Sequence, residues 1–213
     1  MSEIIPGILE KEWHEIERKI ELVVPFAKII HIDIIDGKFA PNTTFLDPAP
    51  FKKYTNDIFF ELHMMVEEPI RYLKPWAAVG FRRFLGHIEH MTDQVEFVAQ
   101  TQLLGEVGLA IDGPTSLEKV RVPYEDLDAF LVMTIKAGFS GQVFQQDLLE
   151  KVKKLRAKTA VPIEVDGGVN DKTIRLAHHA GVSRFVSTSF LFREGNVKNQ
   201  WGTLEKVCKQ RLR

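Results

Sequence analysis

The sequence predicts a closed (β/α)8 barrel. Eight short apolar runs, each about the length of a strand, alternate with amphipathic stretches along the chain. The runs are rich in Ile, Val, Phe and Leu, as expected for parallel strands that are buried on both faces. Eight uninterrupted units within 213 residues favour a compact barrel over an open sheet.

The strands are expected, in chain order, at Glu3–Ile8, Lys28–Asp33, Ile58–His63, Arg83–His87, Val107–Ile111, Ala129–Thr134, Pro162–Asp166 and Arg184–Ser187. Helices are expected at Glu10–Val24, Thr92–Leu104, Gln146–Thr159, Asp171–Ala180 and around Trp201, Leu204 and Val207. Thr92 is expected to cap its helix, with Val95, Val98 and Leu103 packed inward. Asn170 is expected to cap the helix that follows it. We therefore expect one strand–helix unit after another around the barrel.

Composition places the chain among ordinary globular proteins. It is 45% hydrophobic and 27% charged, with a formal net charge of −1. No linker or charge block divides it, so residues 1–213 are expected to form one domain. Neither a nucleic-acid nor a membrane partner is expected from this charge and hydropathy. Cys208 is the single cysteine, and no signal peptide is visible, so a cytoplasmic location is expected.

Four potential metal ligands stand where three of the predicted strands end. They are His31, Asp33, His63 and Asp166. His31 and Asp33 are two residues apart on one strand and therefore point to the same face. Each residue alone is weak evidence, because polar side chains are common at strand ends. Together they form a complete set of donors for a divalent ion, which would offset the cost of burying their carboxylates.

The two aspartates suggest proton transfer. Asp33 and Asp166 belong to well-separated strands and could face a substrate from opposite sides. One carboxylate would remove a proton next to a carbonyl, and the other would return a proton from the far side, which inverts a stereocentre. An alternative is that one of them serves only as a ligand, or that Asp166 caps the following helix.

Glycines and hydroxyls follow the last three strands. They are Gly138, Phe139, Ser140 and Gly141, then Gly167 and Gly168, then Thr188 and Ser189. Loops after the seventh and eighth strands are the common phosphate site of a barrel. These glycines could equally make tight turns and nothing more.

Several segments resemble the ribulose-phosphate 3-epimerase family. In order along nearly the whole chain, they are His31–Phe45, Leu62–Val66, His87–Glu89, Val132-Met133 leading to Gly138–Gln142, and Glu164–Asn170. The first and last of these motifs are specific to that family.

The resemblance implies a (β/α)8 barrel of the ribulose-phosphate-binding type and an isomerase. It would interconvert D-ribulose 5-phosphate and D-xylulose 5-phosphate through an enediolate, with Asp33 and Asp166 as the acid/base pair. It implies a divalent metal, zinc or iron(II) first and manganese or cobalt next, on the four ligands named above. The phosphate would lie on the glycine loops and on Thr188 and Ser189. Met65, Met133 and His63 would also contact substrate, and a homo-oligomer is expected.

Three departures fall on the rim that should hold the sugar phosphate. Gly7 stands where the family usually has Ser, so a hydroxyl that contacts substrate is absent. Thr188 stands where Gly is usual, adding a hydroxyl but crowding the backbone. Lys136 replaces Asn or Glu. From sequence alone, Gly7→Ser is expected to tighten substrate binding.

Two other functions remain open at this point. The chain could epimerise another ketose phosphate, such as allulose 6-phosphate, or bind a sugar phosphate without turnover. A related group of decarboxylases and aldolases carries Asp-x-Lys-x-x-Asp on one strand. This chain has Ile35 at the Lys position after Asp33, which counts against that chemistry.

Overall fold

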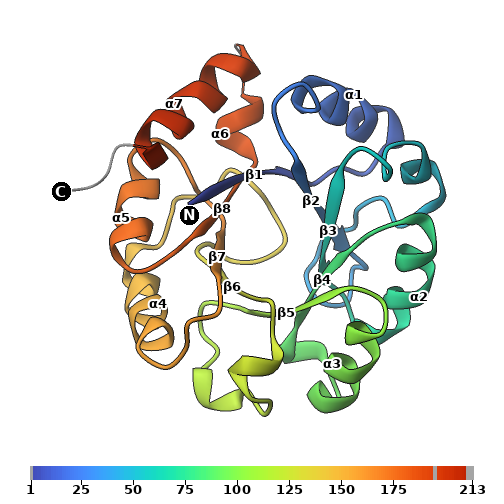
Figure 1. The fold of residues 1–213 in the computed structure, drawn as a ribbon, viewed down its shortest axis with the longest axis vertical. Coiled ribbons are helices and arrows are strands. Elements are labelled where there is room, and N and C mark those ends of the chain that lie inside the picture. The colour runs from blue at the N-terminus through green and yellow to red at the C-terminus, as the bar shows by residue number, and fades with distance from the viewer. Residues whose placement is uncertain (1, 194–195, 210–213) are drawn as a thin grey trace.

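The computed structural model describes residues 2–193 and 196–209. Eight parallel strands close into a barrel in chain order, which confirms the predicted fold (Figure 1). They are β1 (Glu3–Ile8), β2 (Ile29–Ile35), β3 (Phe59–Met65), β4 (Arg83–His87), β5 (Glu106–Ile111), β6 (Ala129–Met133), β7 (Ile163–Asp166) and β8 (Arg184–Ser187). Pairing of β8 with β1, in which Pro6 lies opposite Ser187, closes the ring.

The outer ring of helices is less regular than expected. It contains α1 (Trp13–Val23), α2 (Ile70–Val79), α3 (Gln94–Gln102), α4 (Leu149–Arg156), α5 (Thr173–His179), α6 (Ser189–Phe192) and α7 (Val197–Lys209). The connection from β2 to β3 carries only the 3-10 helix η1 (Ala49–Lys53). That from β5 to β6 carries only the 3-10 turns η3 (Leu117–Lys119) and η4 (Tyr124–Asp126). Strict alternation of strand and α-helix is therefore wrong at these two connections.

Local side chains explain where two helices begin. The Asp93 carboxylate accepts a hydrogen bond from the Glu96 amide at 3.0 Å, so Asp93 and not Thr92 caps α3. Val98 packs inward as expected, together with Phe97, whereas Val95 and Leu103, which were also expected to pack inward, are exposed. Before α5, Asn170 Oδ1 accepts from the Lys172 and Thr173 amides, as expected of a capping residue.

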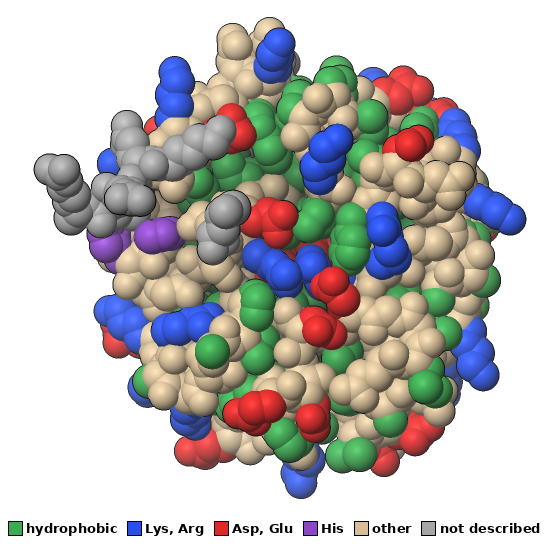
Figure 2. Space-filling view, in the orientation of Figure 1, with side chains coloured by type: hydrophobic (Ala, Val, Ile, Leu, Met, Phe, Trp, Pro, Cys, Tyr) green, Lys and Arg blue, Asp and Glu red, His purple; other side chains and the backbone are tan. Residues whose placement is uncertain are grey.

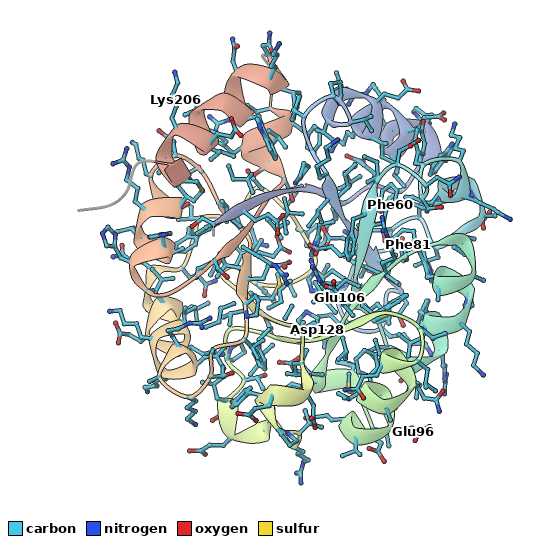
Figure 3. The ribbon with its side chains drawn as sticks, in the orientation of Figure 1. Phe60, Phe81, Glu96, Glu106, Asp128 and Lys206 are labelled. Carbon is cyan, nitrogen blue, oxygen red and sulfur yellow. The ribbon has the colours of Figure 1, made fainter. Side chains whose placement is uncertain are left out.

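Alternation of side chains along the strands separates an outer core from the barrel interior. Even-numbered residues of β2 and β3 face outward and pack beneath the helices. Phe60 is one of them and stacks on Phe81 with ring centroids 5.2 Å apart (Figure 3). The interior is apolar near the carboxyl ends of the strands, where Ile35, Met65 and Met133 meet.

Charged side chains occupy the interior toward the amino ends of the strands. Arg83 forms a salt bridge with Glu106 at 2.7 Å, and Arg184 lies 3.6 Å from Glu3. Basic and acidic side chains accordingly gather over the centre of this end of the molecule (Figure 2). Glu106 is labelled near this centre in Figure 3. The carboxyl ends of the strands, at the opposite end of the barrel, therefore remain available for a functional site.

Candidate active site

The barrel brings the four predicted metal ligands together. His31 and Asp33 project inward from β2, His63 from β3 and Asp166 from the end of β7. Asp33 and His63 lie opposite each other in the pairing of β2 with β3. One donor atom of each residue lies within 4.8 Å of the others, and all four side chains are buried. The cluster is therefore one site assembled from three strands.

Distances within the cluster suit a shared cation. His63 Nδ1 lies 2.7 Å from Asp33 Oδ1 and 3.6 Å from Asp166 Oδ2. His31 Nε2 lies 3.2 Å from the same Asp33 oxygen. Two imidazoles and two carboxylates form a donor set that zinc and other divalent first-row metals accept. These residues therefore fit a divalent ion.

The two aspartates differ sharply in acidity. Burial and the neighbouring Asp33 charge raise the pKa of Asp166 to about 7. Burial acts in the same direction on Asp33, but the adjacent His31 and His63 side chains hold its pKa well below the usual range. Near neutral pH the metal-free site therefore contains one ionised carboxylate and one that is partly protonated.

A layer of charged side chains below the cluster orients His31. Its Nδ1 lies 2.7 Å from Glu61 Oε1, and Glu61 in turn pairs with Arg83. Glu164 Oε1 is also 3.3 Å from this nitrogen, although neither Glu164 oxygen has a hydrogen-bond partner among the residues described. The shorter bond to Glu61 takes the proton on Nδ1, and burial and the Glu61 charge raise the pKa of Glu164. His31 thus directs Nε2 toward Asp33.

A second chain of hydrogen bonds orients His63. Its Nε2 lies 2.9 Å from His87 Nε2, and His87 Nδ1 lies 3.0 Å from Glu89 Oε2. Burial lowers the pKa of His87, whereas the His87 contact helps hold the pKa of Glu89 at about 2 despite its burial. A neutral His87 that donates from Nδ1 to the Glu89 carboxylate must accept at Nε2. His63 then carries its proton on Nε2 and leaves Nδ1 free to bind a cation.

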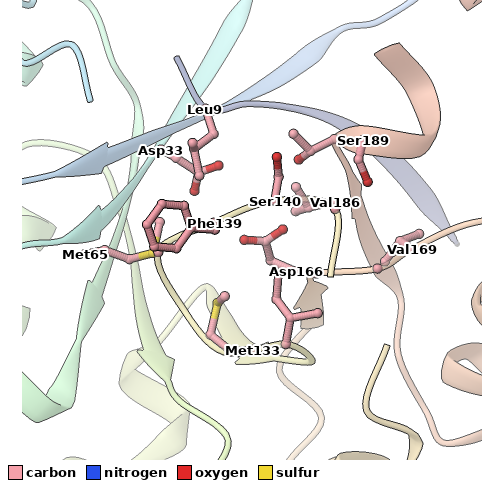
Figure 4. Close-up of a pocket in the computed structure, with 16 residues that line it drawn as sticks. Leu9, Asp33, Met65, Met133, Phe139, Ser140, Asp166, Val169, Val186 and Ser189 are labelled. Carbon is pink, nitrogen blue, oxygen red and sulfur yellow. The ribbon is translucent and has the colours of Figure 1, made fainter. Parts of the chain in front are cut away.

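Asp33 and Asp166 form part of the wall of a cavity at the carboxyl ends of the strands, and Figure 4 shows both carboxylates pointing into it. All but one of the predicted substrate contacts line the same cavity: Met65, Met133, Gly138, Phe139, Ser140, Gly141, Gly167, Gly168, Thr188 and Ser189. His63 is the exception, because it is fully buried beneath the cavity and does not line it. Lys136 also lies outside, with an exposed side chain.

Backbone conformation accounts for two of the glycines. Gly138 has φ +114° and Gly168 has φ +68°, which L side chains rarely adopt. A Cβ at Gly168 would lie 2.8 Å from the Phe144 amide nitrogen. These glycines therefore do shape tight turns, and the same turns turn the loop backbone toward the cavity. The tight-turn interpretation is confirmed at these positions, and the phosphate site stays a prediction.

Sequence reasoning missed several residues around the site. Leu9, Ile135, Val169 and Val186 also line the cavity. Glu61 and Glu164 each stand two residues before a predicted ligand, so the period of a strand could have placed them in the interior. His87 and Glu89 were noted only as part of a motif, without a role.

Comparisons with known proteins agree with this geometry. Residues 3–192 match the ribulose-phosphate 3 epimerase family. Ribulose-phosphate 3-epimerase from Schizosaccharomyces pombe is 32% identical over 199 residues, which cover 90% of this chain and 87% of that protein. The Bacillus subtilis enzyme of the same name is 30% identical over 210 residues, or 93% and 95% of the two chains. A relative from Oryza sativa subsp. japonica, 33% identical over 90% of this chain and 87% of that protein, is named as a cytoplasmic isoform.

Solved structures support the fold. The barrel of 3-keto-L-gulonate-6-phosphate decarboxylase from Vibrio cholerae superposes with a TM-score of 0.72 at 12% identity, over 97% of both chains. That of 3-hexulose-6-phosphate synthase from Salmonella typhimurium gives 0.71 at 15% identity, over 97% of this chain and 98% of the other. Within residues 2–193 and 196–209, no helix is both long and apolar enough to cross a bilayer.

Proposed function

The chain belongs to the ribulose-phosphate 3-epimerase family, and from this premise we propose that it interconverts D-ribulose 5-phosphate and D-xylulose 5-phosphate. The observation that carries the proposal is the pair of aspartates in one cavity. Their environments push their pKa values apart, to about 7 for Asp166 and to below the usual range for Asp33. Paired groups of this kind are typical of an acid and a base that act on one substrate.

In the proposed reaction, one carboxylate removes the proton on C3 and the other delivers a proton to the opposite face of C3. Asp33 extends from β2 and Asp166 from β7, on different sides of the barrel. Removing the C3 proton leaves an enediolate, which can be protonated from either face. Return by the second carboxylate inverts the stereocentre, and the reverse reaction exchanges the two roles.

A divalent ion held by His31, Asp33, His63 and Asp166 would supply positive charge beside the negative charge that develops on the substrate oxygens. The other residues that line the cavity bind the substrate and enclose it. The Met65 and Met133 side chains line the cavity without acidic protons, so they exclude water and cannot protonate the intermediate. The loop at Gly138–Gly141 and the residues Gly168 and Ser189 are proposed to hold the phosphate.

Exchange of the C3 hydrogen with solvent deuterium tests this function directly. The purified protein is loaded in turn with zinc, iron(II), manganese and cobalt, and incubated with ribulose 5-phosphate in D2O. Deuterium at C3 and formation of xylulose 5-phosphate are expected with at least one metal. Asp166→Asn should fold but lose turnover, whereas Asp57→Asn on an exposed turn should keep it.

A parallel panel of six-carbon ketose phosphates, including allulose 6-phosphate, checks the substrate. Turnover confined to a six-carbon sugar would contradict the proposed substrate but keep the reaction type. Binding without exchange, under every metal, would instead indicate a sugar-phosphate-binding protein. The cytoplasmic location and the homo-oligomeric state remain predictions, and light scattering of the purified protein tests the second.

A further inference from the structure

Two of the three departures from the family pattern are neighbours on adjacent strands of the barrel. Gly7 lies on β1, and Thr188 follows β8 directly. Because Pro6 lies opposite Ser187, the next residues along the two strands are Gly7 and Thr188. A Cβ built on Gly7 would lie 2.3 Å from Thr188 Oγ1 and 2.7 Å from Val186 Cγ1. The Thr188 hydroxyl therefore fills the space in which a side chain at position 7 would begin.

This contact argues against the expectation that Gly7→Ser would tighten binding. Real Cβ atoms essentially never come within 3.0 Å of such a neighbour, so a serine at position 7 needs the Thr188 side chain to move. Gly7 and Thr188 thus form a matched pair. Neither departure is explained alone, but each permits the other.

The Thr188 hydroxyl is also available to a ligand. Thr188 is half-buried and lines the same cavity as Asp33 and Asp166. Although it precedes α6, its side chain makes no capping hydrogen bond. Within the described part of the chain, no other hydrogen bond to this hydroxyl is formed either. A hydroxyl in a cavity wall without a protein partner can donate to and accept from a polyol.

We propose that Thr188 is a specificity-determining residue whose hydroxyl, placed over Gly7, hydrogen-bonds a hydroxyl of the sugar chain of a ketose phosphate. Gly7 itself carries no hydroxyl, so in this chain the hydroxyl reaches the cavity from the residue that follows β8. The inference rests on the proposed function for the nature of the substrate. It differs from the role implied by the resemblance, in which this position holds the phosphate.

Calorimetric titration of the zinc-loaded protein with ribulose 5-phosphate and with inorganic phosphate separates these roles. Thr188→Val keeps the volume of the side chain but removes the hydroxyl. It should weaken binding of ribulose 5-phosphate by roughly three- to tenfold, the worth of one neutral hydrogen bond, and leave binding of inorganic phosphate unchanged. Thr188→Ser restores the hydroxyl and should recover the affinity for the sugar phosphate. Thr203→Val, on the exposed side of α7, is the matched control.

A double-mutant cycle tests the steric pairing. Gly7→Ser alone should weaken ribulose 5-phosphate binding or lower the melting temperature. Gly7→Ser with Thr188→Gly should recover part of the loss, because Val186 Cγ1 still lies 2.7 Å from the position of the new Cβ. Equal losses for both ligands in Thr188→Val, or no loss, would overturn the proposed contact. Normal affinity and stability in Gly7→Ser alone would overturn the pairing. A wild-type protein that exchanges no C3 proton but shows these binding differences would refute the epimerase function and not this inference. Absence of ribulose 5-phosphate binding by the wild type would overturn both.

Discussion

Metal binding should release protons from the cluster, and the number released should depend on pH. Burial opposes a charge on His31, but Asp33 and the glutamates around it raise its pKa well above the ordinary value. Asp166 has a pKa of about 7 in the metal-free protein. At pH 6, His31 is therefore protonated, and Asp166 is about nine-tenths protonated. A cation needs the lone pair of one and the carboxylate of the other, so both protons must leave.

The magnitude follows from these two groups. They release about two protons per metal ion below pH 7 and fewer above it, once Asp166 has ionised. Affinity should accordingly rise by about 100-fold per pH unit below pH 7 and less steeply above it. The sign follows from the raised pKa values, because protonated ligands compete with the metal and this competition fades as the pH rises.

Competition with a chelator of known pH dependence, from pH 5.5 to 8.5, measures this slope. Asp166→Asn should lower the slope below pH 7 to about one proton, because the asparagine has no proton to release on metal binding. Asp57→Asn, a change of the same kind on an exposed turn, should leave it unaltered. An affinity independent of pH, or an unchanged slope in Asp166→Asn, would refute the assigned protonation states.

Three further changes test the surroundings of the cluster. His87→Leu removes the hydrogen-bond acceptor that orients the His63 side chain. Zinc affinity, measured by chelator competition, should therefore fall by about 10- to 100-fold. An unchanged affinity would contradict the proposed chain of hydrogen bonds. Arg83→Leu leaves the Glu61 carboxylate buried without its cation. The free energy of unfolding in urea should therefore fall by about 3–5 kcal/mol. A decrease below about 1 kcal/mol would show that the ion pair is dispensable. Gly138→Ala forces φ +114° on a side chain that would meet Ala40 Cβ at 2.8 Å, so KM for the sugar phosphate should rise, and a normal KM would mean that the loop adapts freely.

Strands were predictable because their chemistry is uniform. The bounds of β1, β4 and β8 agree with the sequence expectation at both ends. Strands β2 and β3 were expected to end at Asp33 and His63, yet they continue to Ile35 and Met65. A polar residue was taken as the end of a strand, but the interior of this barrel accepts polar side chains that pair with one another. Polarity therefore did not mark the ends of these strands.

Helices were less predictable where proline interrupts the pattern. No residue range was predicted for helix α2, and Pro75 lies inside it. Conversely, helices were expected between all strands, but Pro114 and Pro123 stand in the connection that forms only 3-10 turns before β6. Proline removes a backbone donor in both segments, and packing against the barrel decides which of them still forms a helix. A single sequence does not contain that information.

The site divides into parts that differ in how freely they can vary. Each strand that bears a ligand also bears a charged or ligating side chain two residues earlier: His31 before Asp33, Glu61 before His63, and Glu164 before Asp166. Two of these three, Glu61 and Glu164, are buried acids beneath the ligands, and Glu61 is paired with Arg83, so losing Arg83 leaves a buried charge without compensation. Thr188 lines the cavity and Gly7 is buried behind it, so the observed constraint there is a steric fit between two neighbouring strands. A hydroxyl can therefore move from one wall residue to another without disturbing the hydrogen bonds that orient the acid, the base and the ligands. In this chain the ligand cluster is intact, but positions 7 and 188 depart from the family pattern. We therefore expect a change in substrate preference with the same proton chemistry.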